Sequence, residues 1–297
     1  MSDGSSIEWC DATWQPVLGC TRVDFRCDKC YAISVVHRGM SPQHKGLTKL
    51  RPKDAARPGV DWNGTVRLQP DKLVEPLRWR KPRRVFVCSL ADLFHPKVPF
   101  EHIAAVFRIM GATPQHTYLV LTKRPERARE FFAWLDPEPA KMLPRLLSIC
   151  AGQPWPLGNV HLGVSVSDQA TAEADIPALI DCPAVVRWVS YEPALGPVDF
   201  TRQGWLCCGA GDRGGPHVDW IVVGGESGPG ARPFDIEWAR DVVRQCAGTG
   251  TRVFVKQLGS CPVEWRTALS RVKLNLNDAK GGDMSEWDAD LRVREMP

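Results

Sequence analysis

Three cysteines near the start of the chain, Cys20, Cys27 and Cys30, have the spacing C-x6-C-x2-C. The C-x2-C pair places two thiolates on one tight turn, where both can ligate the same metal centre. A structural zinc site normally has four protein ligands. A [4Fe–4S] cluster on three thiolates leaves one iron open to a substrate or cofactor, whereas electron-transfer clusters usually have four cysteines. The spacing therefore favours a [4Fe–4S] cluster with an open position.

Zinc is the second interpretation of the same three cysteines. Cys10 and His37 stand close to them in the sequence, and either side chain can supply a fourth ligand. In that case the protein would be a zinc-binding structural protein, or one that binds nucleic acid or a partner without catalysis.

The remaining cysteines differ in their surroundings. Eleven cysteines cannot all pair within one chain, because the number is odd. The first residues are polar and do not resemble a signal peptide, so we expect a cytoplasmic protein with reduced or metal-bound thiols. Four cysteines in apolar stretches are expected to fill the core, namely Cys88, Cys150, Cys182 and Cys246. Cys207 and Cys208 lie in a glycine-rich segment and receive no role.

Composition sets the outer limits of the prediction. The chain has 297 residues, of which 43% are hydrophobic and 24% charged, as in ordinary globular proteins. This length suits two average domains or one α/β barrel. Membrane spans need about eighteen or more consecutive apolar residues, and the chain has no such run, so no membrane partner is expected. The net charge of +4 permits a polyanionic partner without requiring one.

Apolar runs and helical patterns alternate along the chain. The candidate strands are residues 15–19, 84–89, 117–122, 160–166, 186–190, 220–224 and 252–256. Several are continuously apolar, which is typical of parallel strands buried on both faces. Candidate helices are residues 101–112, 169–180 and 236–247, with Asp168 and Asp235 as N-caps of the last two. Helical residues also follow the cysteine loop from Tyr31, and a short helix is expected around residues 71–79.

This order predicts an α/β fold, a parallel (β/α) partial TIM-type barrel of six to seven strands, with an open doubly wound sheet as the alternative. We assign the barrel to residues 1–258, with a basic loop insertion at 39–64. Residues 259–297 are expected to form a C-terminal extension of loops and a short strand, packed on the barrel.

The predicted strands end in residues that can contact a ligand. In barrels and open α/β sheets, ligands bind at the carboxyl ends of the strands. The residues there are Cys20, Ser89, Asp92, Lys123, Arg124, Ser165, Ser167, Ser190, Glu192, Gly224, Gly225, Glu226 and Lys256. Loops are polar by default, so each position alone has a solvated alternative. Together they predict a polar pocket at one face of the sheet.

Motifs along nearly the whole chain resemble the phage-associated three-Cys-motif family. The N-terminal motifs are Ile7-Glu8-Trp9, Asp11-Ala12-Thr13-Trp14 and Gly19-Cys20 with the cysteine motif ending in Cys30-Tyr31. The central motifs are Pro76-Leu77-Arg78-Trp79, Asp92-Leu93-Phe94-His95, Leu121-Thr122-Lys123-Arg124-Pro125 and Leu162-Gly163-Val164-Ser165-Val166. The C-terminal motifs are Ser190 with Glu192-Pro193, Gly224-Gly225-Glu226-Ser227-Gly228, Lys256-Gln257 and Lys280-Gly281-Gly282 with Leu291-Arg292-Val293-Arg294. The resemblance implies a three-Cys-motif partner protein.

That family in turn resembles radical S-adenosylmethionine (SAM) enzymes. The resemblance implies that the three cysteines hold a [4Fe–4S] cluster whose open iron binds SAM. One electron from a donor then splits SAM to a deoxyadenosyl radical. The sequence departs from the common pattern in its longer first cysteine gap and in Lys29, which replaces the aromatic residue before the last cysteine. The Gly-Gly-Glu that commonly follows the second strand is also absent there and follows the sixth strand instead.

The resemblance also implies roles for the strand-end residues. Ser89 and Asp92 are expected to contact the SAM amino group, and Ser165, Ser167 and Ser190 its ribose or carboxylate. Gly224 and Gly225 would let the backbone approach SAM, and Glu226 would accept hydrogen bonds from its amine or ribose. The catalytic candidates are Glu192, as a proton acceptor or SAM contact, and Lys123, as a carboxylate or phosphate ligand. For each charged side chain, the alternative is a solvent-exposed charge with no role in a site.

Two basic segments are candidates for binding a polyanionic partner such as nucleic acid. Residues 78–84 contain five basic residues and Trp79, but they precede the second strand, at the end of the sheet away from the cysteine loop. Residues 43–57 include Lys45, Lys49 and Lys53 against one acidic residue and leave the cysteine side of the first strand. They are the better candidate for a polyanion, with a mobile solvated loop as the alternative. Together with the phage resemblance, they predict nucleic-acid modification or repair.

Overall fold

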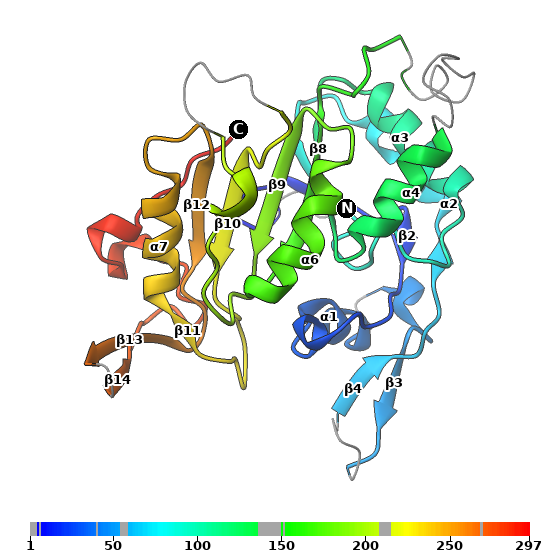
Figure 1. The fold of residues 1–297 in the computed structure, drawn as a ribbon. Helices are drawn as coiled ribbons and strands as arrows, with labels where there is room; N and C mark the ends of the chain where they lie inside the picture. Colours follow the sequence, from blue (N-terminus) through cyan, green and yellow to red (C-terminus); the bar gives the residue numbers. More distant parts are fainter. Residues whose placement is uncertain are drawn as a thin grey trace. The chain divides into compact units, whose positions relative to one another are not determined.

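The chain folds as an α/β protein whose largest sheet has seven strands (Figure 1). A computed structural model describes residues 5, 7–39, 41–53, 59–135, 150, 152–207, 215–267 and 270–297, without the side chains of residues 266 and 267. The strand order is β1-β6-β7-β8-β9-β10-β12. The chain divides into two compact units, Met1–Leu162 with Cys182–Val185, and Gly163–Asp181 with Val186–Pro297. The predicted α/β class is confirmed, and the domain boundary at residue 258 stays a prediction.

The first unit holds three parallel strands of the sheet, β1 (Ala12–Trp14), β6 (Arg84–Val87) and β7 (Thr117–Thr122). β8 (Val160–Val166) crosses the division between the units. β7 and β8 match the predicted ranges, because the apolar run Tyr118–Val120 is buried and every residue of β8 is buried on both faces of the sheet. α3 (Phe100–Gly111) follows β6, and α4 (Pro125–Leu135), which was not predicted, follows β7. The two helices pack through the rings of Phe107, Phe131 and Phe132.

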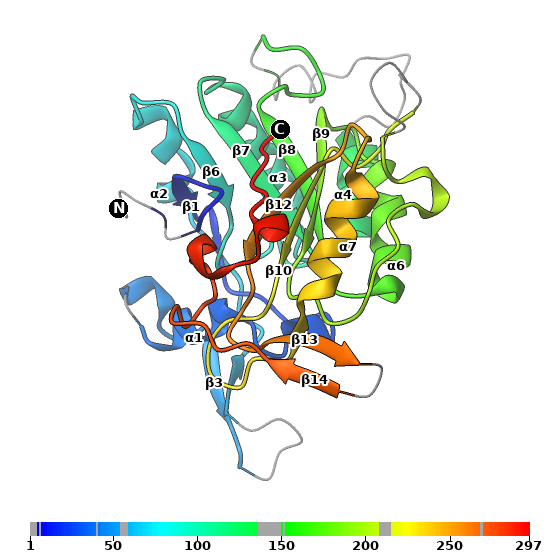
Figure 2. The same ribbon diagram turned by 90° about the vertical axis from the view of Figure 1, so that its left-hand side faces the viewer.

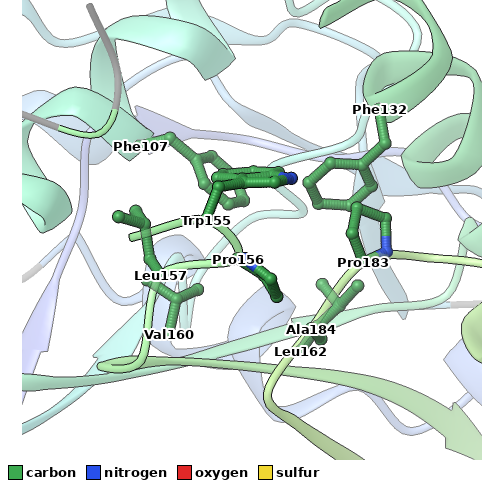
Figure 3. A pocket seen from close by; sticks show the side chains of 9 residues that line it. All are labelled: Phe107, Phe132, Trp155, Pro156, Leu157, Val160, Leu162, Pro183 and Ala184. Atoms are coloured by element: carbon green, nitrogen blue, oxygen red, sulfur yellow. The ribbon is translucent and has the colours of Figure 1, made fainter. Parts of the chain in front are cut away.

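A small apolar pocket adjoins this aromatic cluster (Figure 3). Its lining consists of Phe107, Phe132, Trp155, Pro156, Leu157, Val160, Leu162, Pro183 and Ala184. None of these side chains is charged, so the pocket offers no ion pair to a ligand. We interpret it as a packing gap in the core of the first unit.

The first predicted strand, residues 15–19, is wrong as a strand of the main sheet. The strand that pairs with β6 is Ala12–Trp14, and it places Trp14 in the core. Pro16 has no N–H to continue that ladder, and its carbonyl accepts instead from Gln69 N at 2.9 Å. The chain then forms β2 (Val17–Leu18), which pairs antiparallel with β5 (Arg67–Leu68).

A second small core lies beneath the cysteine loop. α1 (Tyr31–His37), predicted from residue 31, packs beside an antiparallel hairpin of β3 (Thr48–Arg51) and β4 (Gly59–Trp62) (Figure 1). Its buried residues are Leu18, Ala32, Ile33, Val36, Leu47 and Trp62. The loop expected at 39–64 therefore contains a hairpin, which Leu50 opposite Val60 and Trp62 opposite Thr48 hold in register.

The helix predicted around residues 71–79 is broken into two short turns. These are α2 (Pro70–Leu73) and the 3-10 turn Glu75–Arg78. Pro76 cannot donate to the carbonyl of Lys72, which would be its helical partner. That carbonyl accepts instead from the indole Nε1 of Trp14 at 2.8 Å.

The second unit holds the parallel strands β9 (Val186–Tyr191), β10 (Trp220–Gly224) and β12 (Arg252–Gln257). Its helices are α6 (Gln169–Ile180) and α7 (Ile236–Cys246). Both predicted N-caps are confirmed, since Asp168 accepts from Thr171 N and Asp235 accepts from Glu237 N. α6 and β10 have the predicted bounds, and α7 and β12 differ by one residue at their ends.

A second sheet and the C-terminal segment complete this unit (Figure 2). β11 (Phe234–Asp235) pairs with β13 (Pro262–Thr267), and β13 forms a hairpin with β14 (Ser270–Lys273) that was not predicted. Two 3-10 turns, Met284–Glu286 and Ala289–Leu291, lead to the end of the chain. There Arg294 forms an antiparallel bridge with Phe254 of β12.

Among the described residues, no helix is both long enough and apolar enough to cross a membrane. All described cysteines are free thiols. The four predicted core cysteines are buried, with Cys88 and Cys182 almost completely inaccessible. Cys208 lies outside the described residues, as does part of the basic segment 43–57.

Candidate functional site

The three cysteines share one loop of the first unit, between β2 and α1. Asp24 caps the short 3-10 turn Phe25–Cys27, and the amide of Val23 donates to the Cys27 sulfur at 3.5 Å. Cys30 is the N-cap residue of α1, and its amide donates to the Cys27 carbonyl at 3.3 Å. The loop is therefore built from local turns that fix the positions of Cys27 and Cys30.

The thiols are close enough to influence one another electrostatically. Burial, and then the charge of Asp92, raise the pKa of Cys20 to about 12, and Cys30 adds to this increase. Burial also raises the pKa of Cys30, and the charge of Cys27 acts in the same direction. Lys123 opposes the shift at Cys30, and Arg124 opposes it at Cys20. Electrostatic interactions therefore link Cys20 with Cys30 and Cys30 with Cys27, beside two cations, and a metal centre would have to displace the thiol protons.

Arg124 links this cluster to a buried carboxylate. Its Nη1 lies 2.9 Å from Asp92 Oδ2 and 3.8 Å from the Cys20 sulfur, and its Nη2 donates to the carbonyl and hydroxyl of Thr21. Asp92 also accepts from the Thr122 hydroxyl at 2.8 Å and from the amides of Phe94 and Lys123. Each Asp92 oxygen thus accepts two hydrogen bonds. The carboxylate holds Arg124 against the loop of Cys20.

His95 supports the same loop from the other side of Thr21. Its Nδ1 accepts from the amide of Lys97 at 3.1 Å, so its Nε2 carries the proton and donates to the Thr21 hydroxyl at 2.9 Å. Burial and the positive charge of Arg124 lower the pKa of His95 to about 4. The imidazole is therefore neutral at physiological pH and acts as a fixed hydrogen-bond donor.

A second arginine ties the cysteine loop to the β3–β4 hairpin. Arg22 Nε donates to Asp61 Oδ1 at 2.7 Å, and Arg22 Nη1 donates to the Cys27 carbonyl and to Asp28. The other oxygen of Asp61 accepts from Arg51 at 3.1 Å. Asp61 is buried and holds both guanidinium groups, so it joins the base of the hairpin to the loop.

Ser89 lies beside the residue that follows the last cysteine. Its hydroxyl accepts from the Gln15 amide at 2.5 Å, and its carbonyl accepts from the Tyr31 hydroxyl at 2.6 Å. The structure therefore brings together, within the first unit, the three predicted cysteine ligands and the candidates Ser89, Asp92 and Lys123.

The other predicted site residues belong to the second unit. Glu192 and Lys256, at the ends of β9 and β12, form an ion pair with Nζ and Oε1 separated by 2.7 Å. Ser165 donates to the Glu192 carbonyl at 3.2 Å, and Ser190 is buried in β9. The Ser167 hydroxyl is fully buried and has no hydrogen-bond partner among the described residues. This unit therefore gathers serines and a paired Glu–Lys at the carboxyl ends of its strands.

The Gly-Gly-Glu segment follows β10 in the same unit. A Cβ added to Gly225 would lie 2.5 Å from the Leu258 carbonyl oxygen and 2.8 Å from Phe234 Cβ, and one on Gly224 would lie 3.2 Å from the Gln257 carbonyl. These glycines therefore let the backbone of β10 pack against the loop after β12. Glu226 is buried and binds the guanidinium of Arg232 at 2.7 Å, which closes its own loop.

The side chains around the three cysteines can be compared with the ligand sets of a zinc ion and of an iron–sulfur cluster. Among the described residues, no three His, Cys, Asp or Glu side chains are arranged to ligate one metal ion. Cys10 donates to the Ser5 hydroxyl, His37 bonds to Thr48, and the described residues do not group either side chain with the three cysteines as a ligand set. In a cluster each cysteine ligates a different iron, so the sulfurs stand further apart than around one zinc. Arg124 and Lys123 place positive charge beside Cys20 and Cys30, which favours the thiolate form that any metal centre needs.

Sequence reasoning missed several residues that hold the loop. The sequence indicates Arg124 only as a strand-end residue that can contact a ligand, and it does not single out Thr21, Arg22 or Asp61. Asp61 lies well over twenty residues from its partner Arg22 in the sequence, and no local pattern links them.

A protein-family model matches residues 4–288, and its description is "Protein of unknown function (DUF5131)". No curated protein matches the chain. No solved structure matches it either.

Proposed function

The chain belongs to this family, and from that premise we propose that it is an iron–sulfur enzyme of the radical SAM type that modifies or repairs nucleic acid. Cys20, Cys27 and Cys30 would hold a [4Fe–4S] cluster. The proposal includes the TIM-type barrel, an electron donor and a three-Cys-motif partner protein, as the sequence resemblance implies.

One observation carries the proposal: the loop between β2 and α1 contains all three cysteines, and the charge of Cys30 acts on Cys20 while that of Cys27 acts on Cys30. A closed structural zinc site would have four ligands around one ion. Three thiols without a fourth favour a cluster that keeps an open coordination position.

The residues of the first unit would hold and tune this cluster. Arg124 and Lys123 place positive charge beside Cys20 and Cys30, which offsets the charge of thiolate ligands. Because the oxygens of Asp92 already accept four hydrogen bonds, we assign it the positioning of Arg124 rather than direct contact with the SAM amino group. When bound, the cluster supplies the electron that cleaves SAM.

The second unit contains the other residues for which the sequence predicts a SAM contact or a catalytic role. Ser167 offers a buried hydroxyl that has no hydrogen-bond partner in the described part of the chain, and the Glu192–Lys256 pair offers a carboxylate held in one orientation. Their proposed roles are those stated from the sequence, a SAM contact for the serines and a proton acceptor for Glu192.

The test is anaerobic reconstitution with iron and sulfide, followed by metal analysis and an assay for deoxyadenosine release from SAM. We expect about four irons per chain with three cysteine ligands, visible absorption of an iron–sulfur cluster, and reductant-dependent release of deoxyadenosine. Cys27→Ala should lose the cluster, whereas Cys246→Ala, a buried thiol of the second unit, should retain it.

Two results would overturn the proposal. The first is one zinc and little iron in the anaerobically purified protein, which would support the zinc-binding alternative. The second is a full cluster in Cys27→Ala, which would remove the ligand assignment.

A further inference from the structure

An exposed aromatic ring stands directly after the last cysteine. The side chain of Tyr31 is 50% exposed although its hydroxyl donates to the Ser89 carbonyl at 2.6 Å. The polar tip of the ring is therefore held in place while a large part of its surface faces solvent. A ring fixed in this way loses little conformational entropy when a flat ligand stacks on it.

The exposed face of α1 extends from this ring. Ala32, Ile33 and Val36 point into the small core, whereas Tyr31, Ser34 and Arg38 are exposed. The three exposed residues are spaced by three and four positions, so they lie along one side of the helix. At the far end of α1, His37 bonds to Thr48 of β3 at 3.2 Å, and exposed Lys49 follows on that strand.

The charges around this face are unbalanced. Each described carboxylate between residues 20 and 67 is paired with arginine: Asp24 with Arg26, Asp28 with Arg22, and Asp61 with Arg22 and Arg51. The remaining described cations in this range are all exposed and form no ion pair with a described carboxylate: Lys29, Arg38, Lys45, Lys49, Lys53 and Arg67. The surface therefore has an excess of positive charge that a polyanion would neutralise.

We propose that Tyr31 is a stacking platform for an unpaired nucleobase, and that Arg38, which follows α1, and the exposed lysines of the β3–β4 hairpin bind the phosphates of the same strand. Aromatic rings interleaved with cations are typical of single-strand binding, because every base has a face to stack. In a duplex the bases are paired and stacked on each other, so the ring favours a single-stranded or locally opened nucleic acid.

This inference names single-stranded nucleic acid as the substrate class of the proposed enzyme. It rests on the proposed function only in assuming that the bound base is then modified or repaired. The stacking position follows Cys30 directly, so a base on Tyr31 would lie next to the cysteine loop. Binding itself requires no cluster.

The test measures fluorescence anisotropy of a short labelled oligothymidine, an oligouridine and a matched duplex, with the full chain before and after cluster reconstitution. We expect both single strands to bind more tightly than the duplex. Tyr31→Ala should weaken single-strand binding by roughly 5- to 100-fold, as expected for one stacked base. Tyr31→Phe, which keeps the ring, should retain most of the affinity.

The chain offers a matched control for the ring. Trp265 on β13 is also 50% exposed, and its side chain hydrogen-bonds to Asp235. Trp265→Ala should therefore leave binding unchanged. Equal loss in Trp265→Ala and Tyr31→Ala would show nonspecific aromatic contact and would overturn the assignment of Tyr31.

A second variant tests the charges without disturbing a helix. Lys49→Gln should lower the slope of log affinity against log salt by about 0.7, the value for one single-strand phosphate contact. Lys273→Gln, an exposed lysine on β14, should leave the slope unchanged. Wild-type affinity in both Tyr31→Ala and Lys49→Gln, or a preference for the duplex, would overturn the inference. If the protein assembles an iron–sulfur cluster but does not bind the single strands, this inference is wrong and the proposed enzyme stands. If it binds the single strands but assembles no cluster, the proposed enzyme is wrong and this inference stands.

Discussion

Arg124 and Asp92 show how one buried ion pair shapes the cysteine loop. Their side chains are 12% and 7% exposed, and Arg124 also binds Thr21 and approaches the Cys20 sulfur. Removing one partner of a buried pair leaves the other charge uncompensated and typically lowers stability by about 3–5 kcal/mol. The pair therefore stabilises the cysteine loop only while both charged side chains are present.

We expect Arg124→Gln to lower the free energy of unfolding by about 3 kcal/mol, because Asp92 would keep a buried charge without its cation. The double variant with Asp92→Asn should recover part of this loss, since the uncompensated charge is then removed. Urea denaturation of the two single variants and the double variant measures the coupling. Strictly additive losses would contradict a direct interaction between these two side chains.

Gly225 permits a second test at the scale of one residue. Its neighbours leave no space for a Cβ atom, because the Leu258 carbonyl and Phe234 are too close. We expect Gly225→Ala to destabilise the protein by about 1–3 kcal/mol. Gly158→Ala, where nothing lies within 4 Å of the added atom, is the matched control and should have little effect in thermal unfolding. Equal stability of the two variants would argue against a packing role for Gly225.

At the scale of elements, the β3–β4 hairpin and the cysteine loop are joined through Asp61. Asp61→Asn keeps a side-chain oxygen for the Trp62 amide but loses the charge that pairs with Arg22 and Arg51. We expect faster amide hydrogen exchange in residues 20–30, in β3 and in β4, because both elements lose their shared anchor. Exchange in β9 and β10 should stay unchanged. Unchanged protection in the cysteine loop would show that its local turns suffice.

Elements with a simple apolar pattern were predictable from the sequence, and those shaped by distant partners were not. β7, β8, β10 and α6 have the predicted bounds, since each buries a continuous run or begins at a capping aspartate. The first strand was predicted at residues 15–19 but lies at Ala12–Trp14. It has only three residues, and it is held in the sheet because Trp14 is buried in the core. The two hairpins were missed because their exposed strands are short and mixed in polarity.

At the scale of the molecule, the candidate site residues are divided between the two units. The sequence places the three cysteines in one short loop, because they are neighbours along the chain, and their role as metal ligands stays a prediction. It could not predict that Asp92 is fully hydrogen-bonded, that Glu226 binds Arg232, or that Lys256 is paired with Glu192. Those partners are set by the packing of separate strands and loops, which no local spacing encodes.

The response of the whole protein to acid follows from its buried histidines. Burial lowers the pKa of His161 in β8 to about 4, and burial with Arg124 lowers that of His95 to about 4. Between about pH 6.5 and pH 4 the unfolded chain binds protons at these histidines that the folded chain does not. Stability should therefore be fully present above pH 6.5 and fall as the pH decreases towards 4.

Urea denaturation across this range, in wild type and His161→Leu, measures the contribution of one histidine. A shift of this size corresponds to at most about 3 kcal/mol between pH 7 and pH 4. The variant should show a shallower loss of unfolding free energy over the same range, because one proton fewer is taken up on unfolding. Identical slopes in the two proteins would show that the acid sensitivity of the fold arises from other groups.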